Sequence, residues 1–98
     1  MTDISPVRVA AVQAAACPFD TNRAVEIVCS MTAEAAKEGS RLILFPEAYV
    51  GGYPWGLAFG TAVGGRSEVG RSVFGRYWES AIDVPGPEVE RMCQVAGD

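Results

Sequence analysis

The sequence contains no histidine, a single lysine and only three cysteines, and the cysteines form no close-spaced pair. Without histidine, neither a Cys-His nor a Ser-His catalytic pair can form within the chain. The positions of Cys17, Cys29 and Cys93 give little support to a zinc site, so we expect no bound metal. An odd number of cysteines without a recognisable leader peptide favours a reducing compartment, and we expect the protein in the cytoplasm.

The sequence also lacks a basic cluster and a long uninterrupted apolar run. Its net charge of −4 disfavours unspecific nucleic-acid binding, and its N-terminal residues indicate neither a signal peptide nor a membrane span. With 49% hydrophobic and 20% charged residues, its composition is that of a globular protein. We therefore expect a folded protein that binds neither nucleic acid nor a membrane.

Two strands and a helix are predicted in the first half of the chain. Residues 7–14 (VRVAAVQA) are mostly apolar, which is typical of a strand covered on both faces. Residues 23–38 show a helical period, with three candidate N-caps before them and Gly39 as the stop. Residues 41–45 (RLILF) form a second strand that Pro46 ends. The helix has an apolar stripe of Ala24, Ile27, Val28, Met31 and Ala35, and its candidate N-caps are Asp20, Thr21 and Asn22. Strand, helix and strand make a β-α-β unit.

The second half opens with a glycine-rich loop and continues with two predicted helices. One begins near Ser67, and the other has Pro87 at its first position. Their expected inner faces are Val69, Val73, Tyr77 and Ala81 in the first helix, and Val89, Met92, Cys93 and Ala96 in the second. Two strands cannot cover three helices. We therefore interpret residues 1–98 as the N-terminal segment of one larger α/β domain.

Glu47 directly follows one of the most apolar runs in the chain. A carboxylate after a buried strand is either a solvated group at the strand end or a group held in a pocket for its chemistry. Gly51 and Gly52 permit the chain to fold back over it, and four aromatic residues could wall it off, namely Tyr49, Tyr53, Trp55 and Phe59. Such walls would exclude water and raise the pKa of the carboxyl group, as a general base requires.

The segment GSRLILFPEAYVGGYP, residues 39–54, resembles the glutamate motif of the nitrilase branch of the carbon–nitrogen hydrolase superfamily. The matching elements are Gly39, the apolar residues 42–45, Glu47, Val50 and residues 52–54. Residues 7–16 resemble the first strand of that family, and residues 59–60, 77–82 and 84–92 resemble the segment that follows the motif in nitrilases. The likeness covers essentially the whole chain.

The resemblance implies a four-layer α-β-β-α sandwich and a Glu-Lys-Cys catalytic set that uses no metal or organic cofactor. It assigns Glu47 as the general base, a nitrile as the substrate and a homo-oligomer, such as a dimer or spiral, as the assembly. As an aromatic residue, Tyr53 could line the substrate pocket, and a core or interface role for this tyrosine is equally open. An amidase or carbamoylase of the same superfamily is the alternative enzyme.

The catalytic lysine and cysteine implied by the resemblance are not found in the chain. The three cysteines lack the Trp-Glu that follows the family's nucleophile, and Lys37 belongs to the polar side of the first helix. We therefore expect the chain alone to be inactive, and a non-catalytic interaction module remains an alternative. The sequence of residues 65–72 (GRSEVGRS) is also one residue away from the pattern of a phosphate-binding loop. However, Arg71 replaces the required lysine, and no strong strand precedes the segment.

Overall fold

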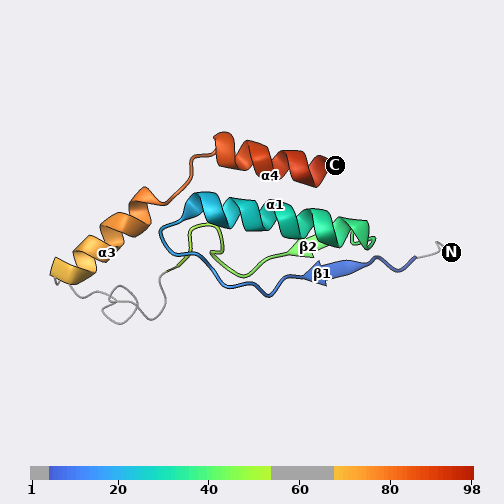
Figure 1. The fold of residues 1–98 in the computed structure, drawn as a ribbon, viewed down its shortest axis with the longest axis horizontal. Coiled ribbons are helices and arrows are strands. Elements are labelled where there is room, and N and C mark those ends of the chain that lie inside the picture. The colour runs from blue at the N-terminus through green and yellow to red at the C-terminus, as the bar shows by residue number, and fades with distance from the viewer. Residues whose placement is uncertain (1–4, 54–67) are drawn as a thin grey trace.

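The computed structural model of the chain describes residues 5–53 and 68–98. In chain order, the described elements are β1 (Val9–Ala11), α1 (Thr21–Lys37), β2 (Leu42–Leu44), α3 (Glu68–Glu79) and α4 (Pro87–Gly97) (Figure 1). Each strand and helix expected from the sequence is present, although both strands are shorter than expected. The chain is an α/β structure.

The two strands form a parallel pair, in a register that places Ala10 opposite Ile43. The pairing continues past the strands, because the N–H of Val12 donates to the carbonyl of Leu44 at 2.8 Å. α1 connects the strands, which confirms the predicted β-α-β unit.

α1 begins and ends where the local sequence predicts. The side chain of Asp20 accepts a hydrogen bond from the N–H of Arg23 at 3.1 Å, which satisfies one of the free donors at the start of the helix. Gly39 follows the helix with φ of +88°, a left-handed conformation that suits glycine. The apolar stripe faces the core as expected, but the fully buried Val25 was not predicted as part of it. The buried apolar residues of the described chain are Ala24, Val25, Val28 and Tyr49.

α4 packs against α1 and begins at Pro87, as predicted. Its expected inner face is only partly right. Val89, Met92 and Val95 are half-buried, whereas Cys93 and Ala96 are exposed. The half-buried apolar residues of α4 therefore lie three positions apart. The sequence pattern predicted a different set of inward-facing residues.

α3 extends beyond the ends of α1 and α4, at the end of the molecule toward which both strands run (Figure 1). Gly70 is buried and Val73 and Tyr77 are half-buried, but Val69 is exposed and Ala81 lies after the helix. The expected inner face is therefore wrong at both ends. A four-residue spacing drifts across a surface with 3.6 residues per turn, so its first and last members leave the contact face.

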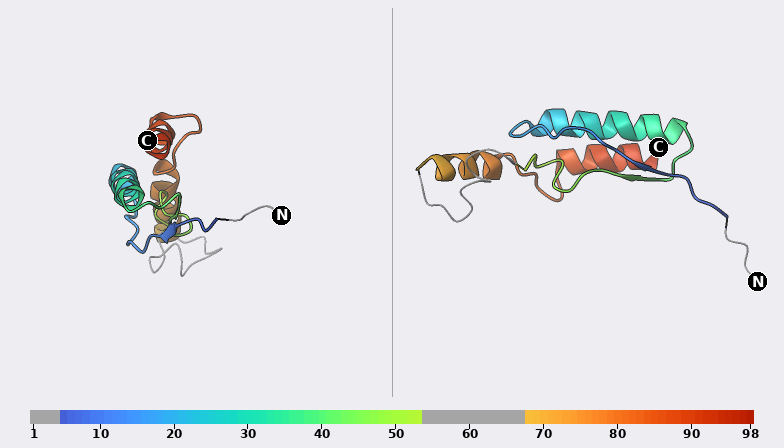
Figure 2. Two further views of the ribbon diagram at one scale, coloured as in Figure 1. Left: turned by 90° about the vertical axis from the view of Figure 1, so that its right-hand side faces the viewer. Right: turned by 90° about the horizontal axis from the view of Figure 1, so that it is seen from below.

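α1 and α4 lie on the same side of the strand pair (Figure 2). On the opposite face Val9, Leu42 and Leu44 are each at least 60% exposed. The expectation of strands covered on both faces is thus wrong for the described residues, because none of their helices packs there. The radius of gyration is 16.8 Å, compared with about 13 Å for a compact domain of roughly this length. The structure is therefore more extended than a closed globular domain.

Candidate active site

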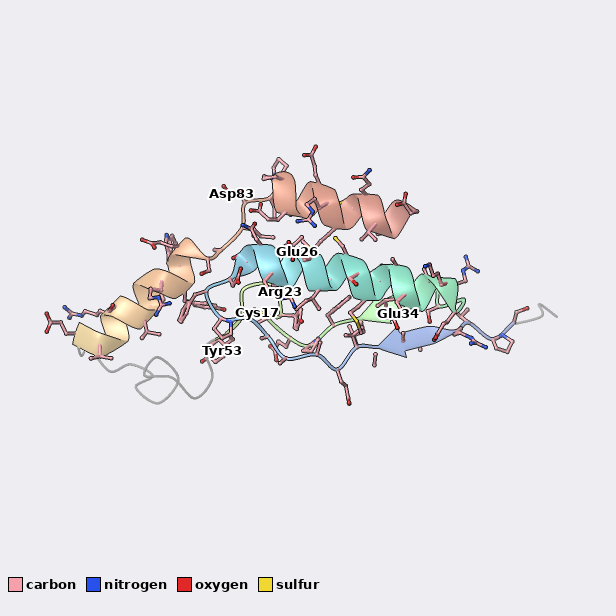
Figure 3. The ribbon with its side chains drawn as sticks, viewed as in Figure 1. Cys17, Arg23, Glu26, Glu34, Tyr53 and Asp83 are labelled. Atoms are coloured by element: carbon pink, nitrogen blue, oxygen red, sulfur yellow. The ribbon has the colours of Figure 1, made fainter. Side chains whose placement is uncertain are left out.

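The connections that follow β1 and β2 meet at one end of the molecule. The loop after β1 passes through Cys17 and Pro18, and the turn after β2 runs from Glu47 to Gly52. Gly52 is buried with φ of +63°, and a Cβ at this position would lie 2.8 Å from the carbonyl oxygen of Cys17. Only glycine permits this approach. Figure 3 shows Cys17 and Tyr53 at this shared end, which is the carboxyl end of the parallel strands, where α/β proteins bind ligands.

Glu47 is the first residue of the turn after β2, and it is exposed. The expectation of a carboxylate walled off from water is therefore wrong for the described chain. Of the four aromatic residues expected around it, Trp55 and Phe59 lie outside the described residues, and Tyr53 is itself 39% exposed. Tyr49 is buried, but its hydroxyl is engaged with another segment. With one face of the sheet uncovered, none of the described elements closes over the carboxylate.

Tyr49 anchors the turn that Glu47 begins. It is only 4% exposed, and its ring centroid lies 5.7 Å from that of Phe45. Its hydroxyl donates a hydrogen bond to the carbonyl of Ala15 at 3.1 Å. Burial raises the pKa of Tyr49, the charge of Cys17 raises it further, and Arg23 opposes both. The turn is thus tied to the loop after β1 by a neutral phenol.

Tyr53 follows the same turn and packs edge-on against Tyr77 of α3, with 5.9 Å between the ring centroids. Tyr77 also approaches the turn itself, because a Cβ at Gly51 would lie 3.5 Å from its ring. The structure therefore brings Tyr53 to the end of the molecule that carries Glu47, and it adds Tyr77 to that region. The sequence pattern predicts Tyr77 only on the inner face of a helix.

Two further contacts join α3 to the start of α1, and both were missed. The hydroxyl of Thr21 donates to the carbonyl of Ser80 at 2.5 Å, and the guanidinium of Arg76 lies 4.0 Å from the ring centroid of Phe19. Arg76 thus stacks on an aromatic ring, an arrangement that suits a planar cation. Both contacts join residues more than fifty positions apart, so no local pattern indicated them.

The cysteines do not form a reactive cluster in the described chain. Cys17 and Cys29 are half-buried, and the Sγ of Cys29 lies 3.9 Å from the carbonyl oxygen of Arg91 on α4. Cys93 is exposed, which corrects the expectation that it fills the core. Lys37 is exposed in the last turn of α1. No group of three or more His, Cys, Asp or Glu side chains that could hold a metal ion occurs among the described residues.

A hollow of about 540 Å³ lies between α1, α4 and β2. Its lining includes apolar residues such as Val28, Phe45 and Met92 together with several polar ones, and neither Glu47 nor Tyr53 lines it. This hollow is therefore a gap in the helix–sheet packing beside β2 and not the pocket expected around Glu47.

The described helices also include none that is long and apolar enough to cross a bilayer.

The chain, which carries a glutamate at the carboxyl end of a parallel strand pair, also matches a known protein family. Residues 8–98 match the carbon-nitrogen hydrolase family. Because this match covers nearly the whole chain, the chain belongs to the carbon-nitrogen hydrolases.

Within this family, the chain is similar to nitrilases. It is 50% identical over 93 residues to Nitrilase 3 of Arabidopsis thaliana, covering 95% of this chain and 27% of that protein. It is 46% identical over 91 residues to a bifunctional nitrilase/nitrile hydratase of Nicotiana tabacum, covering 93% and 26%. It is 44% identical over 89 residues to a nitrilase of Bradyrhizobium diazoefficiens, covering 91% and 28%. The chain thus spans about a quarter of the length of these relatives.

Proposed function

We propose that the chain is the N-terminal segment of a single nitrilase domain and that Glu47 is its general base. The enzyme would convert a nitrile to a carboxylic acid and ammonia. The observation that carries this proposal is the position of Glu47 at the carboxyl end of a parallel strand pair, in a member of the carbon-nitrogen hydrolases. The names of the similar proteins support nitriles as the substrate class.

In the proposed reaction, Glu47 accepts the proton of a cysteine thiol as the sulfur attacks the nitrile carbon, and this proton then passes to the nitrile nitrogen to give a thioimidate. A free thiol is a weak nucleophile near neutral pH, so it needs such a base. One water adds to the resulting thioimidate and ammonia leaves, while a lysine steadies the tetrahedral species. A second water, activated by Glu47, then hydrolyses the thioester, which releases the acid and restores the thiol.

The lysine and the cysteine of this scheme are not assigned within the chain. Lys37 is exposed on α1, and none of the three cysteines has the expected sequence context. We therefore place both groups outside residues 1–98, and we expect the 98-residue chain alone to release no ammonia. The scheme uses no metal and no organic cofactor.

We assign Tyr53 to substrate binding. It follows the turn that begins at Glu47, and it is partly exposed while packed against Tyr77. The exposed part of this side chain could contact an apolar part of a substrate, such as the group attached to the nitrile carbon.

The fold that we propose for the whole protein is a four-layer α-β-β-α sandwich. The exposed apolar side chains of Val9, Leu42 and Leu44 support it, because a second sheet packed on this face would bury them. From the resemblance we also propose homo-oligomers. The odd cysteine count supports a cytoplasmic location.

The test of the proposed function uses a chimera in which this chain replaces the matching residues of Nitrilase 3 from Arabidopsis thaliana. We expect the chimera to release ammonia from one or more of a panel of aliphatic and aromatic nitriles. Glu47→Gln keeps the shape of the side chain but removes the base, so it should lower the rate by about 10²-fold or more.

Glu34→Gln is the matched control. Glu34 is an exposed glutamate on α1, distant from the end where Cys17 and Tyr53 lie (Figure 3), and its loss should leave the rate unchanged. A Glu47→Gln chimera as active as its parent would contradict the role of Glu47. Ammonia released from amides but not from nitriles would favour an amidase or carbamoylase instead.

A further inference from the structure

The turn from Glu47 to Gly52 is held against the loop after β1 at two points. At the first, the buried Tyr49 donates its hydroxyl hydrogen bond to the carbonyl of Ala15. At the second, the backbone of Gly52 lies so close to Cys17 that no side chain fits between them. The turn that starts at the proposed base is therefore fixed to a neighbouring segment on either side of its centre.

The turn is also closed on itself. The N–H of Gly52 donates to the carbonyls of Ala48 and Tyr49, at 3.0 and 3.1 Å. Ala48 lies between Glu47 and Tyr49 and has φ of +54°, a left-handed conformation that an alanine adopts only when its surroundings impose it. The residue next to Glu47 therefore holds an unfavourable backbone conformation, and the anchors on its C-terminal side keep it there.

We propose that Tyr49 is a positioning residue for Glu47, because its buried ring and its hydrogen bond to Ala15 hold the backbone from which the carboxylate projects. This inference deepens the proposed function and rests on it. Tyr49 would touch neither substrate nor nucleophile. Its raised pKa agrees with this role, since the phenol stays protonated and able to donate.

The effect of losing Tyr49 should appear in the chemical step. A base displaced by about 1 Å can lower a rate by about 10²-fold, even when the change is remote from the reacting atoms. Substrate binding through Tyr53 does not use this tie, so KM should change little. A merely structural role would instead lower the amount of folded protein and leave kcat per folded molecule unchanged.

The first experiment measures kcat and KM of the same chimera with three substitutions. Tyr49→Leu removes the ring and the hydroxyl, and it should lower kcat about 10²-fold with KM within about threefold. Tyr49→Phe keeps the ring and loses one neutral hydrogen bond, so it should restore kcat to within about fivefold of the parent. Ile27→Ala is the control for general destabilisation, since Ile27 is half-buried on α1 and lines a hollow whose lining includes no residue of the turn. It should leave kcat unchanged.

The second experiment does not depend on activity. Amide hydrogen exchange at Gly52 reports directly on the closed turn, because this N–H donates to Ala48 and Tyr49. In the chimera, Tyr49→Leu should speed exchange at Gly52 by about tenfold or more, while Ile27→Ala should not change it relative to other amides.

The results separate the two proposals. Loss of activity in Glu47→Gln tests the base, whatever Tyr49 does. If Tyr49→Leu leaves both kcat and exchange at Gly52 unchanged, or if Ile27→Ala has the same effect on them, the positioning role is overturned. If the parent chimera is inactive, the proposed function fails, and exchange at Gly52 still decides whether Tyr49 holds the turn.

Discussion

At the scale of single residues, Tyr49 should make the stability of the folded protein depend on pH. The pKa of its hydroxyl is raised, chiefly by burial, with a contribution from the charge of Cys17 and an opposing one from Arg23. The folded state therefore favours the neutral phenol more strongly than the unfolded state does. This contribution to stability is fully present below the unfolded-state pKa of about 10, and it is lost as the pH rises through the higher folded-state value.

We accordingly expect the free energy of unfolding to fall as the pH rises above about 10, because the unfolded chain loses the Tyr49 proton first. Urea denaturation of the chimera, followed by far-UV circular dichroism between neutral pH and pH values above about 10, would measure this decline. In Tyr49→Phe the decline should be shallower. Ile27→Ala, which removes no titratable group, should leave the decline as it is in the parent chimera. Equal declines in the parent chimera and in its Tyr49→Phe variant would contradict the role of Tyr49.

Local chemistry made some residues predictable and left others hidden. Asp20 as an N-cap and Gly39 as a helix stop follow from groups within a few positions, and the structure confirms both. The tie from Tyr49 to Ala15 spans 34 positions, so no pattern around Tyr49 pointed to it. The exposure of Glu47 was equally hidden, because burial depends on elements that cross the strand end and not on the strand itself.

At the scale of elements, periodicity predicted which helices and strands exist but not which faces they present. The β-α-β unit follows from an apolar run, a helical stripe and a second apolar run, and it is confirmed. The contact faces of α3 and α4 were partly wrong because each is set by a neighbour. α4 packs against α1, and Val89, Met92 and Val95 are half-buried on it. α3 approaches the turn after β2 through Tyr77.

The uncovered face of the strand pair allows a test of the sandwich. Leu44 is 67% exposed, so Leu44→Lys should change the stability of the 98-residue chain by no more than about 0.5 kcal/mol. In the chimera, a second sheet would bury this position, and an unpaired charge there should cost about 3 kcal/mol or more. The shift of the urea midpoint in both proteins measures the difference.

Ile43→Lys is the control, since Ile43 is half-buried and lies between two exposed neighbours in β2. It points to the side of α1 because side chains alternate along a strand, so it should destabilise both proteins. If Leu44→Lys were tolerated equally well in the chimera, this face would not be covered and the proposed sandwich would be wrong.

At the scale of the whole molecule, large apolar side chains are exposed on both the strand pair and α3. The strand pair exposes Val9, Leu42 and Leu44, and α3 exposes Phe74 and Trp78. The core of the described chain is small, and Ala24 and Val25 are its only apolar residues with no exposed surface. Such a surface is large for a monomer, and it marks sites that other protein surfaces usually cover.

We therefore expect the 98-residue chain, when isolated, to bind the dye ANS and to unfold in a broad transition, with its helices retained but its side-chain packing loose. The chimera should bind little dye and unfold sharply, because the same surfaces are then buried. Dye fluorescence, near-UV circular dichroism and analytical ultracentrifugation would measure these properties in both proteins. A monomeric 98-residue chain with a sharp transition and well-dispersed NMR signals would show that these elements form a complete domain by themselves. Residues 1–98 would then no longer be interpretable as one segment of a larger sandwich.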